Sequence, residues 1–320
     1  MTGSRASSEC AGMTEPGSSS SASAVSHNHA VRMTTAHPAG QHTAGMFEEV
    51  VVGVGDDDTG RDAVALGKEL VSAHGRLTLV HLHVVASKPA PDSGAVGDAA
   101  KRRYTCELLT ALSDEFSVDA RVSCIEARSV RRGLHEYASS RRADLLVVGT
   151  SPPDESSPVP LRDHTREVLE DPPCAVAAAP LDYVAHVATV SRIGVAYDGS
   201  DESERALALG KRLAAERHAE LSAFEAIKPP LYIHDPWNVE AETEAQVEQA
   251  RRRIGAASGA EAEAGAGDAA DELARYSDSV DLLVVGAHKY RPIDHLLDGS
   301  ISQRLTGRAS APLLVLPSSR

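Results

Sequence analysis

Two segments of the sequence occur twice in the same order, and this internal repeat constrains the fold more than any other feature. The segment A-L-G-K-x-L occurs at Ala65–Leu70 and again at Ala208–Leu213. The segment D-L-L-V-V-G occurs at Asp144–Gly149 and, at a nearly equal offset, at Asp281–Gly286. A chain of 320 residues is long enough for two domains that each bury a core. The repeat therefore predicts two domains of the same fold in tandem.

Each copy alternates short apolar runs with longer segments whose apolar residues recur at helical spacing. Leu282–Val285 is an apolar run without polar alternation, which is typical of a strand buried on both faces. Arg61–His74 has the spacing of an amphipathic helix. Because strands and helices alternate, the chain is expected to form right-handed β-α-β crossovers and a parallel sheet.

We therefore predict two tandem doubly wound α/β domains, each with a five-stranded parallel sheet. The first covers residues 46–182 and the second residues 190–320. The predicted strands are 47–54, 77–85, 118–125, 144–149 and 174–179, then 192–197, 221–227, 261–264, 282–285 and 313–317. The predicted helices are 61–74, 99–112, 130–142 and 162–169, then 203–216, 239–254 and 268–276, with a further helix opening at 300. The strand at 261–264 carries the weakest signal because it consists of Ala and Glu.

Residues 1–45 lack apolar periodicity and are rich in Ser, Ala, Gly, Thr and His. Such a segment cannot bury enough surface to offset the entropy of ordering it, and we predict a disordered extension. Its histidines follow no metal-ligand spacing, so we interpret them as part of a low-complexity leader.

Charge and cysteine usage exclude several classes of partner. The net charge of −14 argues against nucleic acid, because binders of the phosphate backbone carry a basic surface. No apolar run is long enough to cross a membrane, and the amino-terminal residues do not resemble a signal peptide. The four cysteines show neither C-x-x-C nor metal-ligand spacing, as expected of isolated thiols in the cytoplasm.

The chemistry-bearing stretch of the second copy runs from Asp281 to Ser300. A buried strand ends at Gly286, a polar loop follows, and Gly299-Ser300 opens the next helix. A hydroxyl beside backbone N–H groups at a helix start can bind an anion. At the carboxyl end of a parallel strand this arrangement predicts a phosphate site.

The repeated unit resembles the universal stress protein family in tandem form, over Phe47–Pro317. Three features carry the resemblance: V-A-Y-D-G-S at 195–200, the spacing G-x2-G-x9-G-[S/T] placed on Gly286, Lys289, Gly299 and Ser300, and A-P-x-x-V-x-P at 311–317. The resemblance implies a Rossmann-like nucleotide-binding fold with ATP, and Mg²⁺ with it, across the carboxyl ends of the strands.

The resemblance also assigns roles to residues of the second copy. Asp198 would accept hydrogen bonds from the adenosine, and Ala226 and Val285 would line the adenine slot. Gly286 would let the backbone approach the ribose, since a Cβ there would clash. The complete set implied by the resemblance is Asp198, Gly199, Ala226, Val285, Gly286, His288, Lys289, Gly299, Ser300, Ile301 and Ser302, of which Gly299, Ser300 and Ser302 would hold the phosphates.

The second copy departs from the family pattern at Lys289, which stands where the second glycine is expected, with Arg291 close by. Two interpretations remain open. The Lys289 side chain could block the approach of the phosphates to the backbone, or the two cations could bind the phosphates as charges.

The first copy departs further, and we predict that it is structural. Gly55 stands where the second copy has Asp198, and Pro152 occupies the second glycine position. Arg162 and Asp163 replace the Gly-Ser pair, and nearby carboxylates would repel a triphosphate. At most one ATP per chain is therefore expected.

Three functions compete. The first is a non-enzymatic, ATP-binding stress-response module whose ligand state alters binding to a protein partner that the sequence does not identify. The second is a nucleotide-free interaction module that acts through its surfaces. The third is a slow ATPase, with Asp294, His295 and Asp298 as its only candidate groups; no P-loop or nucleophile elbow is present. The resemblance also implies that the two copies pair within the chain through their last strands, 174–179 and 313–316, and a homodimer is a further possibility.

Overall fold

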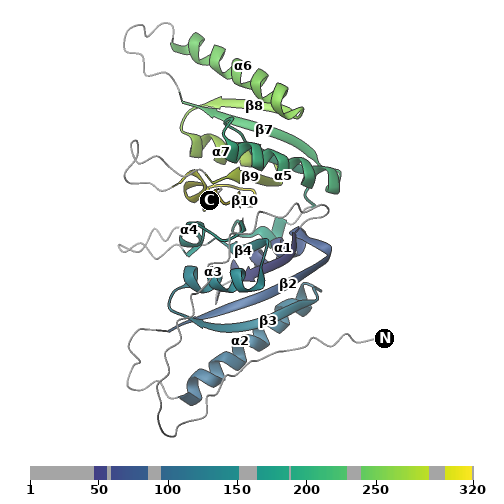
Figure 1. Ribbon diagram of the computed structural model, residues 1–320, viewed down its shortest axis with the longest axis vertical. Helices are drawn as coiled ribbons and strands as arrows, with labels where there is room; N and C mark the ends of the chain where they lie inside the picture. The colour runs from purple at the N-terminus through teal and green to yellow at the C-terminus, as the bar shows by residue number, and fades with distance from the viewer. Residues whose placement is uncertain are drawn as a thin grey trace, which may run out of the picture.

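In the part of the chain that the structure describes, ten strands form one continuous sheet in the order β3-β2-β1-β4-β5-β10-β9-β6-β7-β8 (Figure 1). The computed structural model describes residues 47–55, 59–85, 95–150, 164–186, 189–228, 239–287 and 300–318. The strands are β1 Phe47–Gly53, β2 Val71–Val84, β3 Ala120–Ala127, β4 Leu145–Gly149, β5 Ala175–Ala179, β6 Arg192–Ala196, β7 Glu220–Ile227, β8 Glu261–Ala266, β9 Leu282–Gly286 and β10 Leu313–Leu316. The helices are α1 Thr59–Leu70, α2 Ala95–Glu115, α3 Val130–Arg141, α4 His164–Val168, α5 Asp201–Arg217, α6 Val239–Ser258, α7 Ala269–Ser277 and α8 Ile301–Leu305.

The sheet consists of two five-stranded parallel halves, one from each copy of the repeat. β1 to β5 form the first unit and β6 to β10 the second. The halves join where β5 pairs antiparallel with β10, with Leu314 opposite Ala177. The predicted α/β fold and the predicted pairing of the last strands are therefore confirmed. Predictions for residues 1–45 lie outside the described residues.

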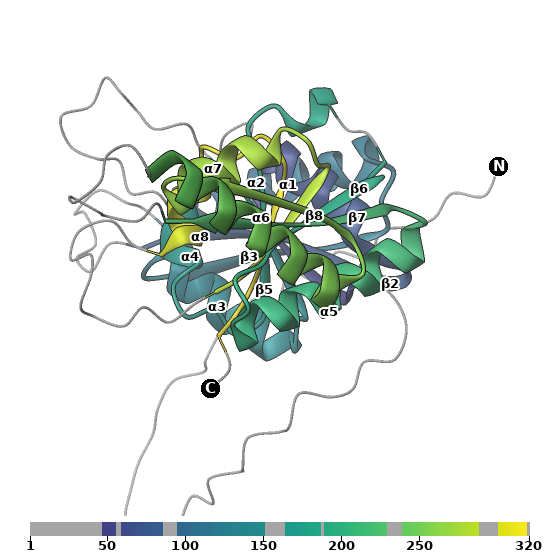
Figure 2. The same cartoon turned by 90° about the horizontal axis from the view of Figure 1, so that it is seen from above.

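Helices cover both faces of the twisted sheet (Figures 1 and 2). Apolar side chains of α1, α2, α5 and α6 pack into one core, and those of α3, α4, α7 and α8 into the other. The central strands are buried on both faces, as in the V-V-V run of β1, so they need no polar alternation.

The first predicted helix was extended too far. α1 ends at Leu70 and β2 begins at Val71, whereas the periodicity predicted a helix through His74. The chain turns here against the start of β1, where a Cβ on Gly75 would lie 2.9 Å from the Phe47 carbonyl oxygen. Apolar spacing cannot reveal this tertiary contact. The weak strand predicted at 261–264 is confirmed as β8, which pairs with β7.

A buried aspartate holds the connection between the two units. Asp62, in the first turn of α1, is 4% exposed, and its carboxylate accepts hydrogen bonds from the backbone N–H groups of Asp182 (3.1 Å) and Val184 (2.9 Å). An ion pair between Glu69 of α1 and Arg217 of α5 joins the helices of the two units on this side. The linker is therefore attached to the first unit by specific contacts.

Candidate functional site

A cavity of about 380 Å³ lies at the carboxyl ends of β6, β7 and β9 in the second unit. The first turns of α5, α7 and α8 close it. Its lining residues are Ala196, Tyr197, Asp198, Ser200, Ser203, Phe224, Ala226, Ala269, Leu273, Val285, Gly286, Ser300, Ile301 and Ser302. A volume of this size is in the range of small-molecule sites.

Seven of the eleven sequence-predicted site residues line this cavity: Asp198, Ala226, Val285, Gly286, Ser300, Ile301 and Ser302. Gly199 is not among the lining residues. His288, Lys289 and Gly299 lie outside the described residues, so the two interpretations of Lys289 both stand.

Small side chains open the apolar end of the cavity. Ala226 and Ala269 face it from β7 and the start of α7. Phe224, two residues before Ala226, lies on the same face of β7, because side chains alternate along a strand. Its ring stacks on Tyr276 with centroids 4.7 Å apart, which gives this end a rigid wall.

Seven lining residues were not among the predicted site residues: Ala196, Tyr197, Ser200, Ser203, Phe224, Ala269 and Leu273. A signal existed for four of them. Ala196, Tyr197 and Ser200 belong to the V-A-Y-D-G-S segment around Asp198, and Phe224 shares the strand face of Ala226. Ala269 and Leu273 could not have been found in this way, since they enter through the packing of α7 on the sheet.

Asp198 organises the turn between β6 and α5. Its Oδ1 accepts hydrogen bonds from the backbone N–H (2.9 Å) and the hydroxyl (2.5 Å) of Ser200. The intervening Gly199 has φ +78°, a left-handed conformation that glycine adopts without strain. The Ser200 hydroxyl in turn accepts from the Ser203 backbone N–H (3.2 Å) and caps α5. Gly199 therefore acts through the turn that places Asp198 and Ser200 at the cavity.

Gly286 has a structural role apart from any ligand. A Cβ at this position would lie 2.6 Å from the carbonyl oxygen of Glu202 in the first turn of α5. The equivalent Gly149 meets the same restriction, because a Cβ there would lie 2.2 Å from the Thr59 carbonyl oxygen. Close packing of helix on strand requires glycine in both units. The predicted approach of a ribose to Gly286 stays a prediction.

Two serine hydroxyls form the polar end of the cavity. Ser300 caps α8, its side chain accepting from the Gln303 backbone N–H (3.3 Å), while the Gln303 side chain accepts from the Ser300 N–H (3.0 Å). The Ser300 and Ser302 hydroxyl oxygens lie 2.9 Å apart. Since α8 has only five residues, these hydroxyl groups offer an anion more than its small helix dipole does.

An ion pair fixes α8 against the start of α7. Arg304 Nη2 donates to Asp268 Oδ1 over 2.7 Å, and Asp268 caps α7 by accepting from the Ala270 backbone N–H over 3.0 Å. The hydrogen bond from Arg304 is the main cause that holds the pKa of Asp268 below its ordinary value. This pair sets the position of Ala269, the next residue, at the cavity wall.

The first unit has larger side chains where the second unit has its cavity. β1 ends at Gly53, which pairs with Val80 of β2, and β6 ends at Ala196, which pairs with Phe224 of β7. Two residues further along each second strand, Leu82 of β2 therefore corresponds to Ala226 of β7. Leu82 packs closely on the start of α3: a Cβ on Gly133 would lie 2.1 Å from its Cδ2.

A second substitution acts at the same place. α3 is capped by Ser129 and α7 by Asp268, so Val130 corresponds to Ala269. Leu82 and Val130 together bring five additional carbon atoms to the positions of Ala226 and Ala269. The prediction that the first unit is structural therefore has a second basis, besides the polar loop that the sequence pointed to.

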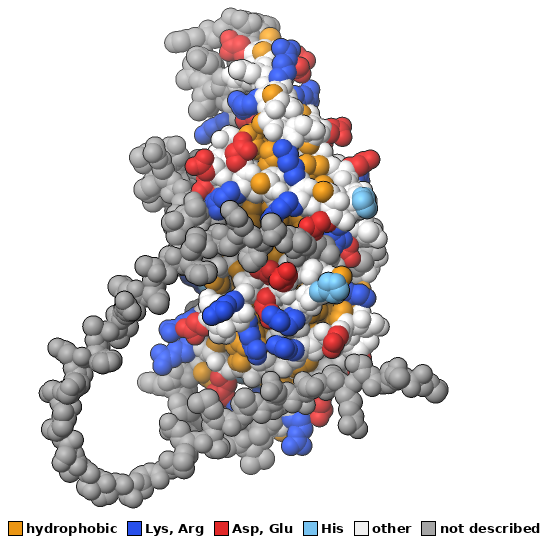
Figure 3. All heavy atoms as spheres, turned by 45° about the vertical axis from the view of Figure 1, so that its right-hand side comes forward, with side chains coloured by type: hydrophobic (Ala, Val, Ile, Leu, Met, Phe, Trp, Pro, Cys, Tyr) orange, Lys and Arg blue, Asp and Glu red, His pale blue; other side chains and the backbone are white. Residues whose placement is uncertain are grey.

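Among the described residues, no three His, Cys, Asp or Glu side chains are grouped so that they could hold a metal ion. The helices of the described ranges include none that is long and apolar enough to cross a membrane. On the face shown in Figure 3, basic and acidic side chains are interspersed, with hydrophobic atoms between them.

Comparison with known proteins also detects the repeat. The model of the universal stress protein family matches residues 46–180 and again residues 189–317. A crystal structure of a universal stress protein from Archaeoglobus fulgidus is similar with a TM-score of 0.61 at 15% identity, over 85% of this chain and 96% of that one. A further structure, from Pseudomonas aeruginosa, is similar with a TM-score of 0.55 at 18% identity, over 84% of this chain and 93% of that one. At these identities the likeness concerns the fold. No curated protein matches the sequence.

Proposed function

Because the chain belongs to the universal stress protein family, with one family domain in each half, we propose that it binds one adenine nucleotide, ATP in the first instance, in its second unit. The observation that carries this proposal is the cavity at the carboxyl ends of β6, β7 and β9. It is apolar around Ala226 and Ala269 and polar around Asp198, Ser300 and Ser302, which suits a flat base at one end and an anionic group at the other.

The residues present fit such a ligand. The slot beside Phe224 and Ala226 would take the adenine, and Asp198 would accept from the sugar hydroxyls. Ser300 and Ser302 would donate to phosphate oxygens through hydroxyl groups that now lie beside each other. Mg²⁺ would enter with ATP, held chiefly by the phosphates, since the described residues offer it no acidic cluster.

We propose a binding module that does not depend on catalysis. Within the described residues, Asp198 and Tyr197 are the only titratable side chains that line the cavity. A hydrogen bond to Glu204 raises the pKa of Tyr197 to about 12, so its hydroxyl is a poor base at neutral pH. The nucleotide would act by stabilising the state in which α5, α7 and α8 are closed on it, which a protein partner in the cytoplasm could recognise.

The test is a comparison of two Ala→Leu variants of the full chain. Ala226→Leu reproduces the first unit's Leu82 in the cavity, whereas Ala257→Leu adds the same atoms on an exposed position of α6. ATP should raise the melting temperature of the wild type and of Ala257→Leu but not of Ala226→Leu. Equal shifts in all three would overturn the proposed location. No shift in any of them would favour a nucleotide-free interaction module, and steady phosphate release would favour a slow ATPase.

A further inference from the structure

A second and larger hollow, of about 1010 Å³, lies between the two units and shares no residue with the cavity described above. We call it the interunit cleft. One wall is formed by the amino ends of β1, β4 and β5 and the end of α3, and the other by α5 and the end of β10. Because β5 and β10 are antiparallel, the amino ends of one unit's strands lie beside the carboxyl ends of the other's.

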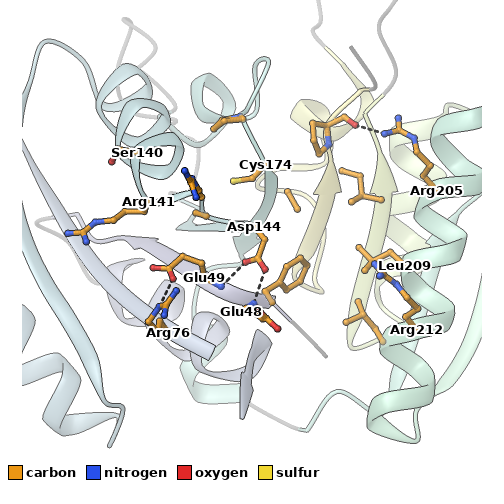
Figure 4. Close-up of a pocket in the computed structure, with 18 of the residues that line it drawn as sticks. Glu48, Glu49, Arg76, Ser140, Arg141, Asp144, Cys174, Arg205, Leu209 and Arg212 are labelled. Carbon is orange, nitrogen blue, oxygen red and sulfur yellow. Dashed lines mark hydrogen bonds and ion pairs between the residues drawn. The ribbon is translucent and has the colours of Figure 1, made fainter. Parts of the chain in front are cut away.

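Arginines line this cleft from both sides, although the chain as a whole is acidic. They are Arg76, Arg121, Arg141, Arg142, Arg205 and Arg212. Figure 4 shows Arg141 on the side of the first unit and Arg205 and Arg212 on α5 opposite, with Glu49, Asp144 and Cys174 between them. Four carboxylates also line the cleft, from Glu48, Glu49, Asp144 and Glu216.

Two of these carboxylates are already engaged. Glu49 accepts from Arg76 Nε over 2.6 Å. Asp144 accepts from the backbone N–H groups of Glu48 (2.8 Å) and Glu49 (3.0 Å). Their charges are therefore compensated within the first unit, and they oppose an anion less than free carboxylates would.

Three arginines of the first unit's wall differ from Arg76 in their surroundings. Within the part of the chain that the structure describes, Arg121, Arg141 and Arg142 pair with no carboxylate; Arg141 lies over the Tyr137 ring, 5.3 Å from its centroid. Elsewhere arginines typically form ion pairs, as Arg132 does with Glu136 and Arg252 with Glu248. Guanidinium groups gathered in a hollow without counter-charges favour an anionic ligand with several oxygens.

Apolar side chains also line the cleft, among them Leu209 and Leu213 on the wall formed by α5, and they could take the organic part of a ligand. Burial raises the pKa of the Cys174 thiol to about 12, so it stays protonated and unreactive at neutral pH.

We propose that the interunit cleft binds a small, multiply phosphorylated molecule, whose phosphates contact the arginines of the first unit's wall. The site is independent of the proposed nucleotide cavity, and both units are needed to form it. Its volume is at the upper end of the range for small-molecule sites.

The experiment uses inorganic tripolyphosphate as the probe, titrated calorimetrically into the full chain. We expect a dissociation constant below about 1 mM at low salt, weakening as salt is added. The pair of substitutions Arg121→Gln and Arg142→Asn should weaken binding by about tenfold or more. Asn is chosen at 142 because that residue adopts a left-handed conformation, with φ 53°.

The matched control removes two other exposed arginines that lie outside the cleft and have no acidic partner within the described residues, Arg103→Gln and Arg128→Asn. It changes the net charge equally and should leave binding within about twofold, since only distant charge is lost. If the cleft variant melts well below the wild type, the single change Arg141→Gln, at an exposed position, replaces it. Absence of binding, or binding that both pairs of substitutions weaken equally, would overturn the proposal.

Discussion

At the scale of single residues, the two units share a fold but differ in the side chain at the end of their second strand. Ala226 lines the cavity at the end of β7, while the larger Leu82 stands at the corresponding position of β2 and packs against the core. The Gly-Ser turn and its loop point to the second unit from the sequence alone. The role of Leu82 could not be predicted in that way, because it depends on the strand register.

Asp198 both stabilises the turn before α5 and lines the cavity. Asp198→Ala should lower the stability of the free protein by about 1 kcal/mol, since the Ser200 N–H and hydroxyl lose their acceptor. It should also weaken ATP binding by about 1–3 kcal/mol, roughly tenfold or more. Chemical denaturation and an ATP titration measure the two effects separately. An unchanged affinity would show that Asp198 serves the turn alone.

The two strand-ending glycines give a prediction that separates packing from ligand binding. Gly149→Ala and Gly286→Ala should each destabilise the chain by about 1–3 kcal/mol, because the added Cβ meets a backbone carbonyl oxygen. Gly255→Ala is the control: within α6 its Cβ would find its nearest neighbour at 3.9 Å, and alanine favours the helix. If Gly149→Ala proved neutral while Gly286→Ala did not, the shared packing explanation would be wrong.

At the scale of elements, the sequence predicts most strands and helices because central parallel strands are uninterrupted apolar runs. The pairing of β5 with β10 was predicted from the resemblance, and the all-buried A-V-A-A-A of β5 fits it. The ends of the elements were harder to predict from the sequence. α1 ends four residues before its predicted end, because the chain at Gly75 packs closely on the start of β1. The contribution of α7 to the cavity, through Ala269 and Leu273, could not be predicted from the spacing of apolar residues in the sequence.

The pairing of α7 with α8 should depend on pH through Asp268. Its pKa is lowered in the folded state, so its charge contributes stability above the ordinary aspartate range, and this contribution is lost as the pH falls through the folded-state pKa. Asp268→Asn keeps a helix cap but removes the charge. The variant should be less stable than the wild type at neutral pH. The unfolding free energies of the two proteins, measured by chemical denaturation, should become equal as the pH falls from about 5 to about 2. A difference that persists at low pH would point to the cap instead.

At the scale of the whole molecule, the continuous sheet and the linker make the two units one structure. Asp62 stabilises the linker by accepting two backbone hydrogen bonds while almost fully buried. Asp62→Ala should therefore cost about 1–3 kcal/mol of unfolding free energy, because two buried N–H groups lose their partner. Asp201→Ala, in the corresponding first turn of α5 but exposed, should change it by less than about 0.5 kcal/mol. Equal effects of the two changes would show that the linker contacts do not matter.

This joined arrangement gives the first unit roles that need no ligand site of its own. The first unit supplies half of the sheet, the partner strand for β10 and one wall of the interunit cleft. Those tasks need its strands and helices, and they leave the end of β2 free to be filled by Leu82.

The central claim is that only the second unit keeps a nucleotide cavity, and the stoichiometry of ATP binding to the full chain tests it most directly. Isothermal titration calorimetry should find one site per chain in the wild type and none in Ala226→Leu. Two sites per chain, or one site that Ala226→Leu leaves intact, would contradict the account.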